Sequence, residues 1–183
     1  MKALLVVTVF LTAAMFVAAP AGAQTTPTVS VFFDKGLTRM DEDCPAGGGM
    51  DSAFVVVQGF NAFIMAVEYA INYPPSMNWL YDYGFPPVTM GTTPSGITEA
   101  FPVPQNAYNP IIVARVVFMW NCDGCTITDD RLIVSPHPVA GFVQAVDFPN
   151  YEFINGVGMT SLVCATVPTE ETTWGQIKSL YGE

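Results

Sequence analysis

The four cysteines are the residues of this chain with the clearest capacity for chemistry. Cys122 and Cys125 have the two-residue spacing of a redox dithiol, whereas Cys44 and Cys164 stand alone. A redox thiol needs a helix N-terminus or a nearby base to lower its pKa, and neither is predicted around this pair. A zinc site needs a second close pair of ligands, and the only histidine is His137. We therefore expect structural disulfides. Of the three possible pairings we favour Cys122 with Cys125, which are close neighbours around a predicted turn, and Cys44 with Cys164.

Other residue types that commonly carry catalysis are scattered. His137 lies between two prolines, with no serine or cysteine nucleophile at motif spacing, so we expect a loop histidine. The sequence holds no nucleophile elbow, phosphate-binding loop or metalloprotease helix pattern. The acids at 41–43, at Asp51 and at 129–130 could offer oxygen ligands to calcium, but they lack the alternating spacing of a calcium loop, so we favour solvated loops over a calcium site. We predict a protein that is not an enzyme and holds no metal or cofactor. The alternatives are an exported hydrolase with a carboxylate-based site and an exported redox protein using the two close cysteines.

A cluster of aromatic residues offers a candidate ligand surface. Trp79, Tyr81 and Tyr83 alternate, with Phe85 continuing the pattern, and would share one face of an extended segment. Exposed rings in such a stripe can stack on sugars or contact a partner protein. The same stripe can instead be the core side of a strand, since aromatic residues are more often buried than displayed.

The first 23 residues have the pattern of a secretory signal peptide. A positive start at Lys2 is followed by an apolar run over 4–19 and by the small residues Ala21 and Ala23 that a signal peptidase accepts. The run is too short for a membrane-spanning helix. We predict cleavage near Ala23, a mature chain that begins at Gln24 without a transmembrane anchor, and a secreted, extracellular or periplasmic location in the cell envelope.

Composition limits the fold and the partners. The chain is 51% hydrophobic and only 12% charged, which leaves few residues for solvated helix faces and favours sheets. Loss of Lys2 leaves 5 basic against 16 acidic residues, a balance that repels nucleic acid and anionic lipid. Proteins or polysaccharides at the cell surface remain as partners.

Short β-branched and aromatic runs alternate with turn signals through residues 24–166, which predicts an all-β fold: an antiparallel, immunoglobulin-like or cohesin-like β-sandwich. Dense prolines between 73 and 110 allow only short strands there. For 63–71 a helix is the competing interpretation, because the segment holds several helix-forming residues, but the Pro74-Pro75 pair would stop it early. The predicted strands are 28–33, 53–57, 63–71, 88–91, 97–101, 111–120, 132–134, 142–146, 151–154 and 159–163.

Residues 167–183 differ in kind from the rest. We predict a linker followed by a short amphipathic helix, in which Trp174, Ile177, Leu180 and Tyr181 form one apolar stripe. A helix of about two turns is unstable alone in water, so the stripe must dock on something. The tail is a candidate recognition or sorting signal.

Several segments resemble a group of uncharacterised exported bacterial proteins. They are 135–141 (SPHPVAG), 144–147 (QAVD), 156–161 (GVGMTS) and the ending 171–181 (ETTWGQIKSLY). The resemblance implies a signal peptide, one cysteine-containing β domain and a tail similar to TWGxIKxLY. More distantly, the strand order and the element 29–34 (VSVFFD) resemble sandwiches of the cohesin and carbohydrate-binding-module type. This second resemblance implies a fold and assigns no functional residue.

Overall fold

The computed structural model describes residues 26–45, 47–84, 88–121 and 130–163, and all the regular secondary structure within them is β-strand. The all-β prediction is confirmed for this part of the chain. The predicted signal peptide, the tail with its helix, and Cys122, Cys125 and Cys164 lie outside the described residues. Among the described residues, no helix is long and apolar enough to span a membrane.

Eleven strands follow one another along the described chain. Nearly all lie where β-branched and aromatic runs predict them, including the segment 63–71, where strand prevails over helix. Their bounds are β1 (Thr28–Phe32), β2 (Gly49–Gln58), β3 (Phe63–Asn72), β4 (Met77–Gly84), β5 (Val88–Thr92), β6 (Gly96–Asn106), β7 (Ile111–Trp120), β8 (Asp130–Ser135), β9 (Val143–Phe148), β10 (Phe153–Gly158) and β11 (Thr160–Val163).

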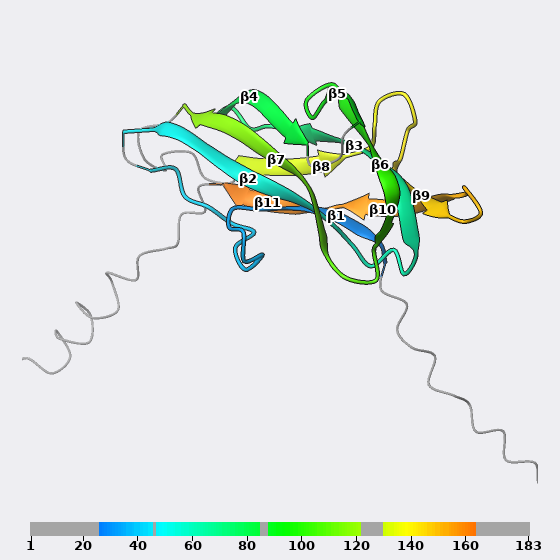
Figure 1. Ribbon diagram of the computed structural model, residues 1–183. Coiled ribbons are helices and arrows are strands. Elements are labelled where there is room, and N and C mark those ends of the chain that lie inside the picture. The colour runs from blue at the N-terminus through cyan, green and yellow to red at the C-terminus, as the bar shows by residue number, and fades with distance from the viewer. Residues whose placement is uncertain (1–25, 46, 85–87, 122–129, 164–183) are drawn as a thin grey trace, which may run out of the picture.

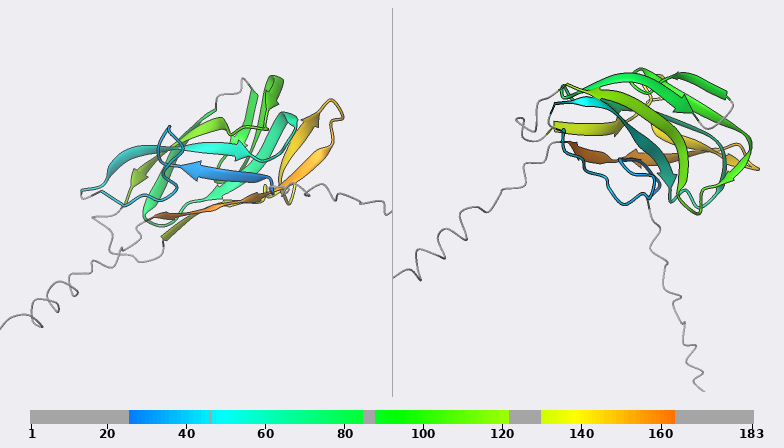
Figure 2. Two further views of the ribbon diagram at one scale, coloured as in Figure 1. Left: turned by 90° about the horizontal axis from the view of Figure 1, so that it is seen from below. Right: turned by 60° about the vertical axis from the view of Figure 1, so that its left-hand side comes forward.

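The strands form two layers that share one continuous pairing path (Figures 1 and 2). One layer runs β1-β2-β7-β4. In the other, β5 pairs with β6 and β6 with β3, and the opposite edge of β3 pairs first with β9 and then with β8. β10 links the layers because it pairs with β9 on one side and β1 on the other.

The end of β7 contributes two large rings to the core. Phe118 and Trp120 are buried and pack edge-to-face, with ring centroids 5.2 Å apart. Arg115 and Met119 of the same strand point to the opposite, exposed face. The β2 residue Val55 is fully buried in the same way. The core draws side chains from both layers, among them Val29, Val31, Ala53, Val57, Ile64, Val67, Tyr69, Ile71, Ile97, Ala114, Leu132 and Ala145.

Four details differ from the sequence predictions. β4 is a strand of 8 residues at Met77–Gly84, in the proline-rich region where only short strands were expected and none was predicted at these residues. The sandwich is not wholly antiparallel, because β1 and β10 pair in parallel. β2 begins at Gly49 inside the predicted loop, since pairing with the end of β7 extends it. β6 runs for 11 residues despite Pro102 and Pro104. These prolines lie where the β3–β6 register shifts, between the pairs at Ala100 and Gln105, so no ladder donor is lost there.

Gly158 occupies the place where the layers meet. A Cβ atom added at this residue would collide with the backbone carbonyl of Val134 on β8. Next to it, the Met159 N–H donates to the Val29 carbonyl, and the Val134 N–H donates to the Met159 carbonyl. Only glycine lets the chain pass this closely between β1 and β8.

Candidate binding surface

Arg115 lies at the centre of a row of side chains on the outer face of the β4-β7-β2 layer. It is in register with Phe54 of β2 on one side and with Tyr83 of β4 on the other. Residues directly opposite one another across paired strands project to the same face, about 5 Å apart. The strand register therefore places a guanidinium between two aromatic rings, on the face away from the core.

Lys35 reaches this face from the turn after β1. The carboxylate of Asp34 accepts hydrogen bonds from the backbone N–H groups of Thr38 and Arg39, at 2.9 and 2.6 Å, and from the Thr38 hydroxyl. The Leu37 N–H donates back to the Asp34 carbonyl and closes the turn. Asp34 thus fixes the loop that carries the lysine, and its own charge is engaged within that loop.

The two cations share a cavity of about 370 Å³, lined by Lys35, Phe54, Tyr83, Ile112 and Arg115. Within the described part of the chain, the side chains of Lys35 and Arg115 make no hydrogen bond or ion pair. The cavity therefore combines apolar walls with two cationic groups that no carboxylate of the described residues neutralises.

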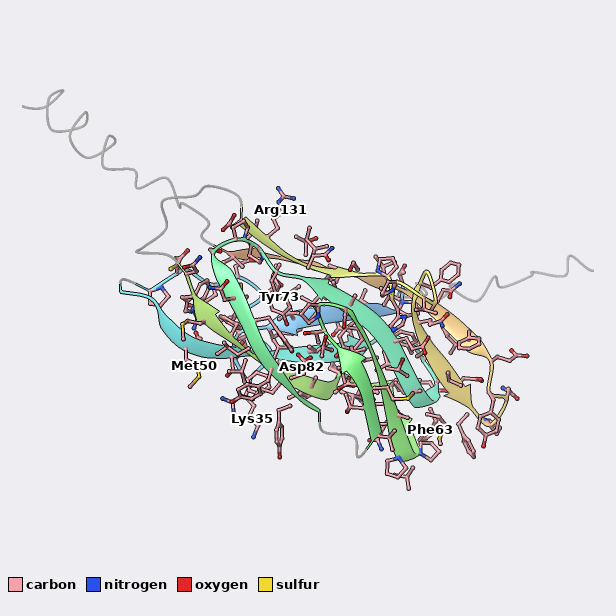
Figure 3. The ribbon with its side chains drawn as sticks, turned by 90° about the horizontal axis from the view of Figure 1, so that it is seen from above. Lys35, Met50, Phe63, Tyr73, Asp82 and Arg131 are labelled. Atoms are coloured by element: carbon pink, nitrogen blue, oxygen red, sulfur yellow. The ribbon has the colours of Figure 1, made fainter. Side chains whose placement is uncertain are left out.

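Exposed apolar side chains extend this cavity along the strands. Tyr81 and Tyr83 are 50% and 63% exposed, and Met50 and Met119 also face solvent. Tyr81 is in register with Val117, and Met50 with Met119, so each pair adds a further row beside that of Arg115. We name this set the aromatic–cationic surface: Lys35, Met50, Phe54, Tyr81, Tyr83, Ile112, Arg115 and Met119. Figure 3 shows Lys35 and Met50 projecting from the molecule, whereas Asp82 and Tyr73 lie further inside.

Trp79, predicted to share a face with Tyr81 and Tyr83, does not. A β-bulge at Leu80 shifts the register, so that Trp79 pairs with the buried Phe118 and Tyr81 with the next residue, Val117. One inserted residue moves the strand's side chains to the other face. Nothing in the even alternation of the aromatic residues indicates this bulge.

The inner side of β4 forms a polar network instead. The Trp79 indole N–H donates to Asp82 Oδ1 at 2.9 Å. The Thr93 backbone N–H and hydroxyl donate to the same carboxylate, each at 2.7 Å. The Tyr73 and Thr93 hydroxyls are 2.8 Å apart. Asp82 therefore ties the edge strand β4 to the turn after β5.

Glu99 is the most unusual titratable group of the interior. It is 0% exposed, its Oε2 accepts a hydrogen bond from the Tyr69 hydroxyl at 3.1 Å, and its Oε1 has no partner among the described residues. Burial raises the pKa of Glu99 to about 8; the hydrogen bond from Tyr69 opposes this rise and the charge of Asp82 adds to it. Burial, and then the charge of Glu99, raise the pKa of Tyr69 well above its ordinary value.

The other candidates from the sequence have structural surroundings. Nδ1 of His137 accepts from the backbone N–H groups of Val139 and Ala140, both at 3.3 Å, so this histidine braces its own turn. Asp41 accepts from the Leu162 N–H at 2.9 Å, and Glu42 pairs with Arg39. Within the described ranges, no three histidine, cysteine or acidic side chains gather as metal ligands do.

Cys44 is buried at the end where β11 stops. Glu42 forms an isolated parallel bridge with Val163, the last described residue before Cys164. The two predicted cysteine pairings remain predictions, because the other three cysteines lie outside the described residues.

Comparison with known proteins identifies the fold. One chain of the complex between CaDoc0917 and CaCohA2 matches with a TM-score of 0.50 and 14% identity, over 77% of this chain and all of that one. The fold is cohesin-like. A cohesin module of a family 33 glycoside hydrolase from Clostridium perfringens matches with a TM-score of 0.48 and 8% identity, over 75% of this chain and 96% of that one.

The seventh ScaB type I cohesin from Pseudobacteroides cellulosolvens matches with a TM-score of 0.46 and 12% identity, over 79% of this chain and 96% of that one. No protein-family model and no curated protein matches the sequence. The cohesin-like sandwich expected from the sequence is thus confirmed as a fold, and the likeness to exported proteins with a TWGxIKxLY-like tail stays a prediction.

Sequence reasoning found Tyr81 and Tyr83 but missed Lys35, Phe54 and Arg115. The sequence did contain an indication of Arg115, because it is the one charged residue in the apolar run that forms β7. A charge in a central strand must point away from the core, toward the outer face. Lys35 and Phe54 join it only through the β1 turn and the β2 register, which no local pattern encodes.

Proposed function

We propose that this protein is a non-catalytic binding module of the extracellular space or cell envelope, and that its aromatic–cationic surface contacts a protein partner. The observation that carries the proposal is the row of Tyr83, Arg115 and Phe54, beside a cavity whose two cations no described residue pairs. Tyrosine, methionine and arginine are enriched where proteins contact one another, and contiguous exposed apolar side chains mark interaction sites.

Two further observations support a binding role. The sequence carries no catalytic motif, and the similar CaDoc0917–CaCohA2 chain comes from a complex of two proteins. Secretion follows from the predicted signal peptide. The proposal includes a role in recognition or sorting for the predicted tail stripe of Trp174, Ile177, Leu180 and Tyr181. It also includes disulfides that stabilise the domain in the oxidising environment outside the cell.

Selection from a random peptide library displayed on phage tests this surface. The purified mature chain is the bait, and selected peptides are titrated against a Tyr81→Ala/Tyr83→Ala variant. We expect peptides that bind the parent protein and lose at least about tenfold in affinity with the double variant, because each lost ring removes buried apolar area. Phe153→Ala is the matched control: Phe153 is 64% exposed, close to the 63% of Tyr83, but lies on β10.

Peptides that bind the double variant as tightly as the parent would refute a role for this surface. A polysaccharide partner is the alternative from the sequence, and a glycan array distinguishes it. Tyrosine-dependent binding of glycans together with no selected peptide would replace the protein partner by a sugar.

A further inference from the structure

The distribution of basic residues gives the aromatic–cationic surface a specific chemistry. The chain has 16 acidic and 6 basic residues, so a basic side chain has many possible carboxylate partners. Four of the six lie in the described part: Lys35, Arg39, Arg115 and Arg131. Arg39 is paired with Glu42 at 2.6 Å, and Arg131 has a contact of its own. The two cations that make no hydrogen bond or ion pair within the described residues line the same cavity.

The nearest acids in sequence and on the flanking strands are occupied elsewhere. Asp34, beside the lysine, accepts hydrogen bonds from the backbone of its own turn. Asp82 lies on β4 but faces inward, toward the Trp79 indole and Thr93. Asp51 on β2 accepts from the Trp120 indole at 3.4 Å. Because these carboxylates accept hydrogen bonds from other donors, the charges of Lys35 and Arg115 remain available to an external anionic group.

We infer that the partner contributes an acidic peptide segment, with a carboxylate seated between Lys35 and Arg115. This inference rests on the proposed function and names the chemistry of the partner. Two like charges lining one cavity repel each other, and an anion between them removes that repulsion. A guanidinium binds a carboxylate through two parallel hydrogen bonds, and the apolar walls of Phe54 and Tyr83 strengthen such bonds by excluding water.

The net charge of −10 does not prevent this contact. At physiological ionic strength, charges separated by more than about 8 Å are largely screened, whereas a carboxylate in the cavity touches both cations. The remaining acids therefore lower the association rate of an acidic segment more than its final affinity. They also repel acidic ligands elsewhere on the surface, so that such a segment binds preferentially in the cavity.

The shape of the surface favours a peptide. From Arg115 to Met119 the exposed rows follow β7 for about 14 Å, which is the length of roughly four residues of an extended chain. Beyond the cavity the rows present Tyr81, Met50 and Met119, which offer apolar contacts and no further cation. Such a surface fits a short segment in which one or two acids are followed by apolar side chains.

The library selection described above provides the test, with charge as the readout. We expect glutamate or aspartate to be enriched in the selected peptides, and replacement of these acids by glutamine to weaken binding at least about tenfold. Arg115→Gln and Lys35→Gln should each cause a comparable loss, and the loss should shrink as salt is raised. Arg131→Gln on β8 is the matched control and should bind as the parent does.

Three results would overturn the inference, and they separate it from the proposed function. Neutral or basic peptides that depend on Tyr83 but not on Arg115 would refute the acidic segment and leave the binding surface intact. Binding of polygalacturonate that depends on Arg115, with no binding of acidic peptides, would assign the site to an acidic polysaccharide. Absence of any ligand that depends on Tyr81 and Tyr83 would refute both proposals.

Discussion

Glu99 gives the domain a pH dependence of stability with a defined sign. In the unfolded chain a glutamate titrates near its ordinary pKa of 4.5, whereas in the folded protein burial raises the pKa of Glu99 to about 8. Between these values the folded state holds a proton that the unfolded state has released. The contribution of Glu99 to the free energy of unfolding is therefore fully present below about pH 4.5. It decreases as the pH rises and stops decreasing above about pH 8.

The size of the effect follows from the two pKa values. A full unit between them is worth about 1.4 kcal/mol, and the folded carboxyl is already half ionised at pH 8, so the interval from pH 6 to pH 8 costs about 2 kcal/mol. This is a large share of the 5 to 15 kcal/mol by which domains are commonly stable. The cause is structural, because ionised Glu99 would have a single hydrogen bond, from Tyr69, among the described residues and lies within electrostatic range of Asp82.

The assay compares urea unfolding of the parent protein and Glu99→Gln at pH 6 and pH 8. Glutamine keeps an oxygen for Tyr69 and cannot ionise, so the stability difference between the two proteins should shift by about 2 kcal/mol in favour of the variant at pH 8. Glu152→Gln, at an exposed position, should follow the parent at both pH values. Equal pH slopes for the parent and Glu99→Gln would refute the reasoning.

The remaining predictions concern the edge strand, the cysteines and the two ends of the chain. Asp82→Ala should lower the free energy of unfolding by about 2 to 4 kcal/mol in urea, because three donors lose their acceptor. Peptide mapping without reductant should link Cys44 to Cys164; a different partner for Cys44 would contradict the pairing. Amino-terminal sequencing of the exported protein should start at Gln24, and retention of the leader would refute cleavage. Deletion of 172–183 should leave cooperative unfolding intact and change the protein's location.

The sequence predicted most strands because each depends on local chemistry. The run 111–120 is almost wholly apolar and rich in β-branched residues, which is typical of a central strand. Proline density misled twice: β4 forms 8 residues of strand between the prolines, and β6 continues through Pro102 and Pro104, where pairing is interrupted. The alternation of Tyr81 and Tyr83 correctly placed both on one face.

What the sequence could not supply depends on register and long-range contacts. The bulge at Leu80 separates Trp79 from the tyrosines, and nothing in the local pattern marks it. Lys35 and Arg115 are 80 residues apart and meet only because β1, β2 and β7 are neighbours. Glu99 looks like one of many solvated acids until β6 turns it inward toward Tyr69.

The parallel pairing of β1 with β10 joins residues near 28 to residues near 157. Closing a loop of this length costs chain entropy before the pairing returns any stability, so folding should be slow and governed by its high contact order. The sheet also cannot be completed until nearly the whole domain has been synthesised. The domain should therefore gain most of its stability only after the residues near 157 have been synthesised, and not in steps as each strand is added.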